Sequence, residues 1–291
     1  MRALYDVPAP AKLNLFLHIT GRRADGYHLL QSVFMLIDWH DSLHLEVTQD
    51  GRITRQDLNT LAPALPADDL IVRAARALQA ATGCTQGAHI ALDKHIPSQA
   101  GMGGGSSDAA STLLALNRLW NLGLDRSELA TIGLQLGADV PFFIGGSNAW
   151  VEGIGEQITP LEGLQALPRA RFVVVKPNAG LDTPGIFSSP LLKRDTQRAT
   201  IADFAANHFD FGHNDLQPVA QALCPDVEKA SNWLASLGLQ ARMTGSGSAV
   251  FAQIKQADFS VTQPCDWTIK VCENLPSHPL KEWIADKRTT G

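Results

Sequence analysis

Apolar and polar residues alternate from Lys12 to Ile19, and this period of two predicts a β-strand. The leucines at positions 13, 15 and 17 would face a core together with Ile19. Lys12 and Asn14 would share the opposite face with Phe16 and His18. The pattern therefore predicts a strand that carries a lysine and an asparagine on the face away from the aliphatic core.

Elsewhere in the first half, apolar residues recur at helical spacing. One predicted helix begins at a capping aspartate, Asp68 or Asp69, and runs to about Thr82. A second covers Ala109 to Trp120, and a third is led by Asp125 and Glu128 at the spacing of a capping box. Strands and helices that alternate in this way are typical of a mixed α and β architecture.

The apolar pattern lapses after Thr159 and resumes with a predicted strand over 170–176, so we place a domain boundary between them. The two predicted domains are residues 1–160 and residues 161–291. The second half reads strand, helix, helix, strand, and its clearest helix is predicted over 226–237. A shortened helix interrupted by Pro264 is expected in the segment 256–267.

The composition of the 291-residue chain predicts a folded protein with a substantial core, since 45% of the residues are hydrophobic and 18% are charged. A net charge of −5 argues against nonspecific binding to nucleic acid. The four cysteines are scattered, which disfavours a zinc site or a disulfide framework and favours reduced thiols in a cytoplasmic protein. No apolar stretch is long enough to predict a membrane span.

Residues 97–108 form a glycine-rich loop between a predicted strand, 88–92, and the predicted helix 109–120. Glycines let a backbone approach a ligand closely, and the N–H groups at the start of a helix attract anions. Ser106 or Ser107 would cap the helix, or would turn a hydroxyl to a phosphate or its metal. The loop lacks the lysine of a Walker sequence and fits the dinucleotide fingerprint poorly, and an ordinary flexible loop is the simpler interpretation.

Phosphoryl transfer would also need a residue to deprotonate a hydroxyl and a cation near the transferred group. Asp139, between Gly137 and Pro141, is the candidate base, with a plain helix N-cap as the alternative. Lys12 is the candidate cation, and a solvent-facing strand lysine is its alternative. If Lys12 lies beside Asp139, it would keep that carboxylate ionised.

The sequence Pro97-x-x-x-Gly101-x-Gly103-Gly104-Gly105-Ser106-Ser107 resembles the phosphate loop of the GHMP kinases, the superfamily of galactokinase, homoserine kinase and mevalonate kinase. Further segments, in order along nearly the whole chain, resemble those of one family within it, the 4-diphosphocytidyl-2-C-methyl-D-erythritol kinases of non-mevalonate isoprenoid biosynthesis. These segments are residues 10–15, 23–28, 136–141, 183–184, 214–216 and 243–247.

The resemblance implies an α+β fold of two domains, with an N-terminal ATP-binding domain, a C-terminal ferredoxin-like domain and the active site in the cleft between them. It implies that Asp139 is the base and Lys12 its partner cation. The residues implied to bind ATP are Asp69, Lys94, Pro97, Ser98, Gln99, Ala100, Gly101, Met102, Gly103, Gly104, Gly105, Ser106 and Ser107.

At the other end of the implied site, Asn14 would help to place the substrate hydroxyl, with Thr183 nearby. Tyr27 and Phe187 would stack on the cytosine, and His28 would hydrogen-bond to its edge. The resemblance also implies Mg²⁺, although no cluster of metal ligands is evident in the sequence. The small-molecule substrate would be 4-diphosphocytidyl-2-C-methyl-D-erythritol.

Some alternatives stay open at this point. A sister kinase acting on mevalonate or homoserine would share the loop but would have no use for the Asp25-Gly26-Tyr27-His28 stretch, and a noncatalytic nucleotide sensor would not need both Lys12 and Asp139. Family members often have Asn at the position of Asp69, so the adenine contacts are in question. The sequence does not distinguish a monomer from a homodimer.

Overall fold

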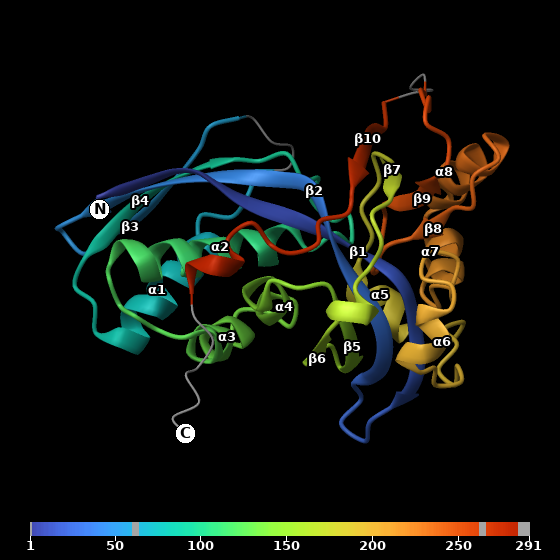
Figure 1. Ribbon diagram of the computed structural model, residues 1–291, viewed down its shortest axis with the longest axis horizontal. Helices are drawn as coiled ribbons and strands as arrows, with labels where there is room; N and C mark the ends of the chain where they lie inside the picture. The colour runs from blue at the N-terminus through green and yellow to red at the C-terminus, as the bar shows by residue number, and fades with distance from the viewer. Residues whose placement is uncertain (1, 60–63, 262–265, 285–291) are drawn as a thin grey trace.

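The computed structural model describes residues 2–59, 64–261 and 266–284, which fold around two β-sheets (Figure 1). The first sheet has the strand order β3-β4-β2-β5-β6, with β1 paired to β2 as well. Its strands are β1 (Ala3–Arg22), β2 (His28–Thr48), β3 (Ile53–Asp57), β4 (Gly87–Asp93), β5 (Ala149–Gly153) and β6 (Gln157–Pro160). The second sheet has the order β10-β7-β9-β8. The fold is therefore of the expected α+β class.

Strands β1 and β2 form one long antiparallel hairpin that runs from the first sheet to the second half of the molecule (Figure 1). The predicted strand 12–19 lies inside β1, and both of its faces are buried, so the alternative of a solvent-facing Lys12 is wrong. The pairing shifts register between Asn14 and Leu17. Phe16 in this interval packs against Trp150, Phe204 and Phe211 in the core. Strict alternation failed here because a bulge lets an extra side chain turn inward.

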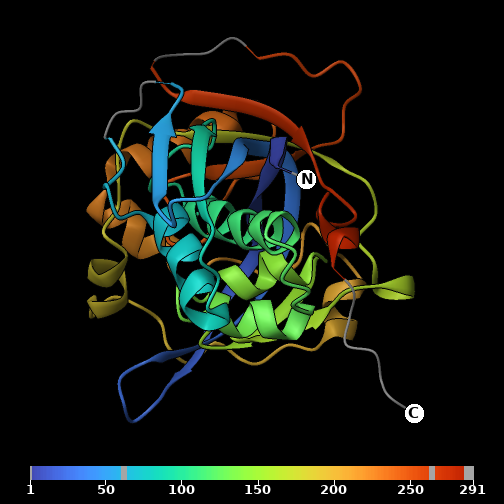
Figure 2. The ribbon, with the colours of Figure 1, turned by 90° about the vertical axis from the view of Figure 1, so that its left-hand side faces the viewer.

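Four helices cover one face of the first sheet (Figures 1 and 2). They are α1 (Leu70–Thr82), α2 (Gly104–Leu119), α3 (Arg126–Leu134) and α4 (Val140–Gly145). Asp69 caps α1 and Gly83 ends it in the left-handed conformation, as the sequence predicts. The predicted capping box of Asp125 and Glu128 is also present. Local capping signals therefore located the starts of both helices.

The second sheet consists of β7 (Arg171–Lys176), β8 (Arg242–Met243), β9 (Val250–Ile254) and β10 (Thr268–Glu273). Along β7, Phe172 and Val174 face the core shared with β1, whereas Val173 and Val175 face α7 (Gln217–Leu223) and α8 (Pro225–Ser236). With β10 next to β7, and β9 between β7 and β8, the sheet has the strand order of a ferredoxin-like unit.

The short helix expected within 256–267 is not formed over residues 256–261, and residues 262–265 with Pro264 lie outside the described residues. After β10 the chain returns to the first sheet, where the amide of Leu275 donates to the carbonyl of Leu36 and Leu280 packs among the helices. Residues 274–284 therefore lie against the first unit. The boundary between 160 and 161 stays a prediction.

Candidate active site

The glycine loop joins β4 to α2, and glycine is required at two of its turns. Gly101 and Gly103 have φ angles of 71° and 70°, in the left-handed region that favours glycine. Helix α2 begins at Gly104, with Gly103 as its N-cap. The expectation that Ser106 or Ser107 caps the helix is therefore wrong, because both lie inside the first turn. The amides at the start of this 16-residue helix remain available for an anion.

Three segments that are distant in sequence meet at this loop. The amide of Lys12 donates to the carbonyl of Met102 at 3.0 Å, which joins β1 to the loop. The amide of Ser248 donates to the carbonyl of Gln99 at 3.1 Å. A Cβ on Gly101 would lie 2.2 Å from the carbonyl oxygen of Thr244, so only glycine allows this approach. The glycine turn at 245–247 is thus held directly against the glycine loop.

Beside the loop lies a cavity of about 510 Å³. Of the residues expected to bind the nucleotide, it is lined by Asp69, Lys94 and the whole run from Pro97 to Ser106. Ser107 does not line it, because its side chain is fully buried and its hydroxyl has no partner in the described structure. The loop and the start of α2 thus line one cavity, and their free amides face the kind of space that an anion would need.

Asp69 at the rim of this cavity is already engaged by the protein. One carboxylate oxygen accepts from the amide of Val72, and the other lies 2.9 Å from the guanidinium of Arg55. Its capping role accounts for an acidic or amide residue at the start of α1 without any ligand.

Lys94 lies beneath the loop rather than on its open surface. Its ammonium group contacts the carboxylates of Asp41 and Asp108, and all three side chains are almost completely buried. Burial favours the neutral amine, but the two carboxylates outweigh it and raise the pKa of Lys94. Asp41 also accepts hydrogen bonds from the amides of His95 and Ile96. This cluster therefore fixes the entry of the chain into the glycine loop.

Lys12 and Asp139 lie together, as the resemblance implies. The Lys12 ammonium lies 3.8 Å from a carboxylate oxygen of Asp139 and donates to the side-chain oxygen of Asn14 at 2.5 Å. The Lys12 side chain is 5% exposed and that of Asp139 30% exposed. Burial lowers the pKa of Lys12, and Asp139 partly offsets the effect. Asp139 occupies the N-cap position of α4, but its side chain makes no capping hydrogen bond.

Asn14 is held by two residues that the sequence did not single out. Its side-chain amide donates to the hydroxyl of Ser32, and its backbone amide donates to the hydroxyl of Thr244. Thr244 belongs to the segment 243–247, which carries the family resemblance as a whole and does not mark this residue individually. Ser32 lies on β2 two residues from Phe34, which pairs with Asn14, and it gave no signal because this proximity depends on the register of the hairpin.

A small cavity of about 180 Å³ lies where these side chains converge. Its lining includes Lys12, Asn14 and Asp139, together with Thr183 and Ser246. The hydroxyls of Thr183 and Ser246 are 2.7 Å apart, and both residues also line the nucleotide cavity. Thr183 also lines a third cavity, together with His28 and Phe187. The three cavities therefore adjoin, with the lysine and the aspartate at the middle one.

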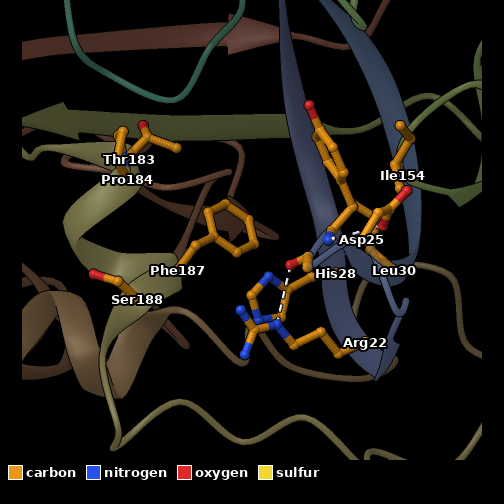
Figure 3. A pocket seen from close by; sticks show the side chains of 11 residues that line it. Arg22, Asp25, His28, Leu30, Ile154, Thr183, Pro184, Phe187 and Ser188 are labelled. Atoms are coloured by element: carbon orange, nitrogen blue, oxygen red, sulfur yellow. Dashed lines mark hydrogen bonds between the residues drawn. The ribbon is translucent and has the colours of Figure 1, made fainter.

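The third cavity, of about 520 Å³, is lined by Tyr27, His28 and Phe187, and Figure 3 shows His28 and Phe187 on opposite sides of it. His28 begins β2 at the tip of the long hairpin, and Phe187 projects toward it from α5 (Thr183–Ser188). Their ring centroids lie 5.2 Å apart. Tyr27 is 60% exposed. Aromatic side chains thus line this cavity, and one of them is largely exposed.

His28 is held by a residue that the sequence did not single out, Arg194, whose Nε donates to the Nε2 of His28 at 2.9 Å. Burial, with Arg194 and Arg22 nearby, lowers the pKa of His28, which therefore stays neutral at neutral pH. Arg194 lies in an irregular segment between two short helices, so no periodicity marked it.

Within the described residues, no three His, Cys, Asp or Glu side chains gather as a metal site, and no helix is long and apolar enough to cross a membrane. Cys84, Cys224 and Cys272 are free thiols, and Cys265 lies outside the described residues. A magnesium ion bound with a nucleotide needs only one or two protein oxygens, since phosphates and water complete its shell. The hydroxyl of Ser106 at the nucleotide cavity fits that need.

The fold and this arrangement of loop, lysine and aspartate define a GHMP kinase. Models of the N-terminal and C-terminal GHMP kinase domains match residues 69–147 and 192–258. A homoserine kinase from Cytophaga hutchinsonii has the same fold, with a TM-score of 0.68 over 96% of both chains at 14% identity.

The particular family follows from nearer relatives. The 4-diphosphocytidyl-2-C-methyl-D-erythritol kinase of Acidovorax sp. strain JS42 is 69% identical over 98% of this chain and 99% of its own. That of Paracidovorax citrulli is 68% identical over 99% of this chain and its whole length. A crystal structure of a 4-(cytidine 5'-diphospho)-2C-methyl-D-erythritol kinase superposes with a TM-score of 0.74 at 34% identity, covering 86% of this chain and 90% of its own. The chain belongs to this family of kinases.

Proposed function

We propose that the protein transfers the γ-phosphoryl group of ATP to the 2-hydroxyl of 4-diphosphocytidyl-2-C-methyl-D-erythritol, giving the 2-phosphate and ADP. The observation that carries this proposal is the sequence of three adjoining cavities, with Thr183 lining all of them. A nucleotide fits the cavity at the glycine loop, and a cytidine fits the aromatic one. The reacting hydroxyl then falls at the small cavity between them.

Asp139 is placed to act as the general base. Its carboxylate makes no capping bond and lines the middle cavity, where a hydroxyl would approach it. Lys12 next to it supplies positive charge where negative charge develops on the transferred group. Asn14, fixed by Ser32 and Thr244, holds the Lys12 ammonium in place and offers the substrate a polar contact. These groups need no rearrangement to reach one another.

The glycine loop and the first turn of α2 would hold the triphosphate through backbone amides. Mg²⁺ bound to the phosphates would neutralise part of their charge, and the Ser106 hydroxyl is the protein oxygen that we assign to it. At the other end, Tyr27 and Phe187 would stack on the base, and Thr183 would lie beside the reacting part of the substrate. We place this reaction in the cytoplasm, where the family's nucleotide substrates are available.

A panel of acceptors tests the proposal. ADP formation is measured with 4-diphosphocytidyl-2-C-methyl-D-erythritol, mevalonate and homoserine, each with and without Mg²⁺, and the product is identified by ³¹P NMR. We expect turnover only with the cytidine compound and a new phosphomonoester on its 2-oxygen. Equal turnover of mevalonate or homoserine would assign the chain to a sister activity. Tight ATP binding without any turnover would indicate a sensor.

A further inference from the structure

Arg194 does not line the aromatic cavity but lies directly behind two residues that do. Its Nε donates to the Nε2 of His28 at 2.9 Å, and one terminal nitrogen donates to the carbonyls of Phe187 and Ser189 at 3.1 and 2.8 Å. The other terminal nitrogen donates to the carbonyl of Leu192 at 2.9 Å. A single side chain thus connects the hairpin wall of the cavity to the helical wall.

These contacts determine the protonation of His28. An arginine side chain can only donate hydrogen bonds, so the Nε2 of His28 must be the acceptor. A neutral imidazole that accepts at Nε2 carries its proton on Nδ1. An imidazolium would set two donors against each other at the same contact, in agreement with the lowered pKa of His28. His28 is therefore a fixed donor through Nδ1.

The four hydrogen bonds of Arg194 also make this donor rigid. Three of them go to carbonyls between Phe187 and Leu192, at the end of α5 and just beyond it, so the guanidinium cannot rotate without losing them. His28 in turn packs against the Phe187 ring. The position of the donor and the position of the stacking ring thus depend on the same arginine.

Cytosine and uracil differ at N3, the ring atom that the Nδ1–H of His28 would meet. Cytosine has an acceptor at N3, whereas uracil carries a proton there and donates. A fixed Nδ1–H can bond to cytosine but faces another donor in uracil. A site built around a fixed polar group discriminates strongly when the pairing fails, because buried polar groups are left unpaired.

We propose that Arg194 is the positioning residue for base selection, which locks His28 as an Nδ1–H donor and so makes the pocket prefer cytosine over uracil. This inference rests on the proposed function for its substrate. It adds a residue that touches neither substrate nor nucleotide and acts only through His28 and Phe187.

The test compares the wild type with Arg194→Met and with Arg198→Met as the matched control. Arg198 lies four residues after Arg194 and forms an ion pair with Glu152. Its side chain is largely exposed and does not line the aromatic cavity. The specificity constant kcat/KM is measured for the cytidine substrate and for its uridine analogue. We expect Arg194→Met to lower the cytidine-to-uridine ratio at least about tenfold, with an unchanged KM for ATP. Arg198→Met should leave the ratio unchanged.

A second measurement reads His28 directly. In ¹⁵N-histidine NMR, the signal assigned through His28→Gln should show Nδ1–H in the wild type and a mixture of tautomers in Arg194→Met. Arg194→Lys, which keeps a donor, should restore part of the ratio and serves if Arg194→Met does not fold. Equal losses of kcat/KM for the cytidine and uridine substrates in Arg194→Met would overturn the proposal. So would a proton on the Nε2 of His28 in the wild type. If neither substrate is turned over, the proposed function fails, while the NMR result and competition between CDP and UDP still decide the role of Arg194.

Discussion

Two buried lysines lie beside the same glycine loop, yet their surroundings differ. Lys94 contacts two carboxylates, and its pKa is raised. Lys12 has one carboxylate at 3.8 Å, and its pKa is lowered. The partners of Lys94 are themselves buried, whereas Asp139 is 30% exposed and faces a cavity. The protein alone compensates the buried charge of Lys94, whereas it compensates the buried charge of Lys12 only in part.

The difference indicates which lysine is available for chemistry. A buried charge that the protein leaves partly unpaired is costly, and such groups cluster at functional sites. Incoming phosphate would supply Lys12 with the negative charge that the fold does not. Lys94 already has two carboxylate partners, so we interpret it as a structural residue that supports the glycine loop.

The largest effect is expected from breaking the Lys12–Asp139 pair. Asp139→Asn keeps the shape of the side chain but removes the proton acceptor, so turnover should fall at least about a hundredfold. Lys12→Met should also remove most of the turnover. Because both residues serve one step, the double variant should be little slower than the worse single variant.

Two results would contradict these roles. The losses of the single variants could multiply in the double variant, or Asp139→Asn could unfold the protein while turnover per folded molecule persisted. Single-turnover assays, ATP binding and thermal melting of the same four proteins separate these outcomes. Melting temperature and ATP affinity should stay near those of the wild type in Asp139→Asn.

For Lys94 the expected effect is on stability. Lys94→Met leaves the carboxylates of Asp41 and Asp108 buried without their cation, and breaking a buried ion pair in this way costs about 3–5 kcal/mol. Lys12→Met should cost less than about 1 kcal/mol, because its partner Asp139 is accessible to water. Urea unfolding measures the loss of unfolding free energy in each of the two variants. Equal losses of stability would remove the distinction between the two lysines.

The sequence was informative where the relevant signals are local. The caps of α1 and α3, the glycine loop and the segment around Asp139 are all readable from neighbouring residues. The glycines of the loop also allow the left-handed turns that it makes, since a side chain at Gly101 or Gly103 would be strained at those φ angles.

The remaining features depend on contacts between distant segments. The partners of Lys94 are 53 and 14 residues away, so its burial could not be read from its own surroundings. The same holds for Phe16, whose inward turn follows from a register shift in a hairpin pairing. Ser32 and Arg194 contact Asn14 and His28, and no pattern along the chain marks such supporting residues.

Changes at the far end of the site should affect substrate binding while leaving the lysines unaffected. Tyr27→Ala or Phe187→Ala removes one of the aromatic walls, and base stacking is worth about 1–3 kcal/mol per base. The KM for the cytidine substrate should therefore rise by about one to two decades, with little change in the KM for ATP. Initial-rate kinetics with each substrate varied in turn provide the measurement. Weaker ATP binding with unchanged substrate binding would mean that the two pockets are assigned the wrong way round.

The smallest effect is expected at Asp69, which lines the nucleotide cavity and forms an ion pair with Arg55. Asp69→Asn retains a good N-cap for α1 and loses only the attraction to Arg55, which keeps its contact with Asp57 at 3.0 Å. Unfolding free energy should fall by less than about 1 kcal/mol. The KM for ATP should stay within about a factor of three of the wild type, since less than about 1 kcal/mol of charge interaction is changed. Asp69→Ala, which removes the cap as well, should cost about 1 kcal/mol more. A tenfold rise in the KM for ATP in Asp69→Asn would instead mean that this carboxylate contacts the nucleotide directly.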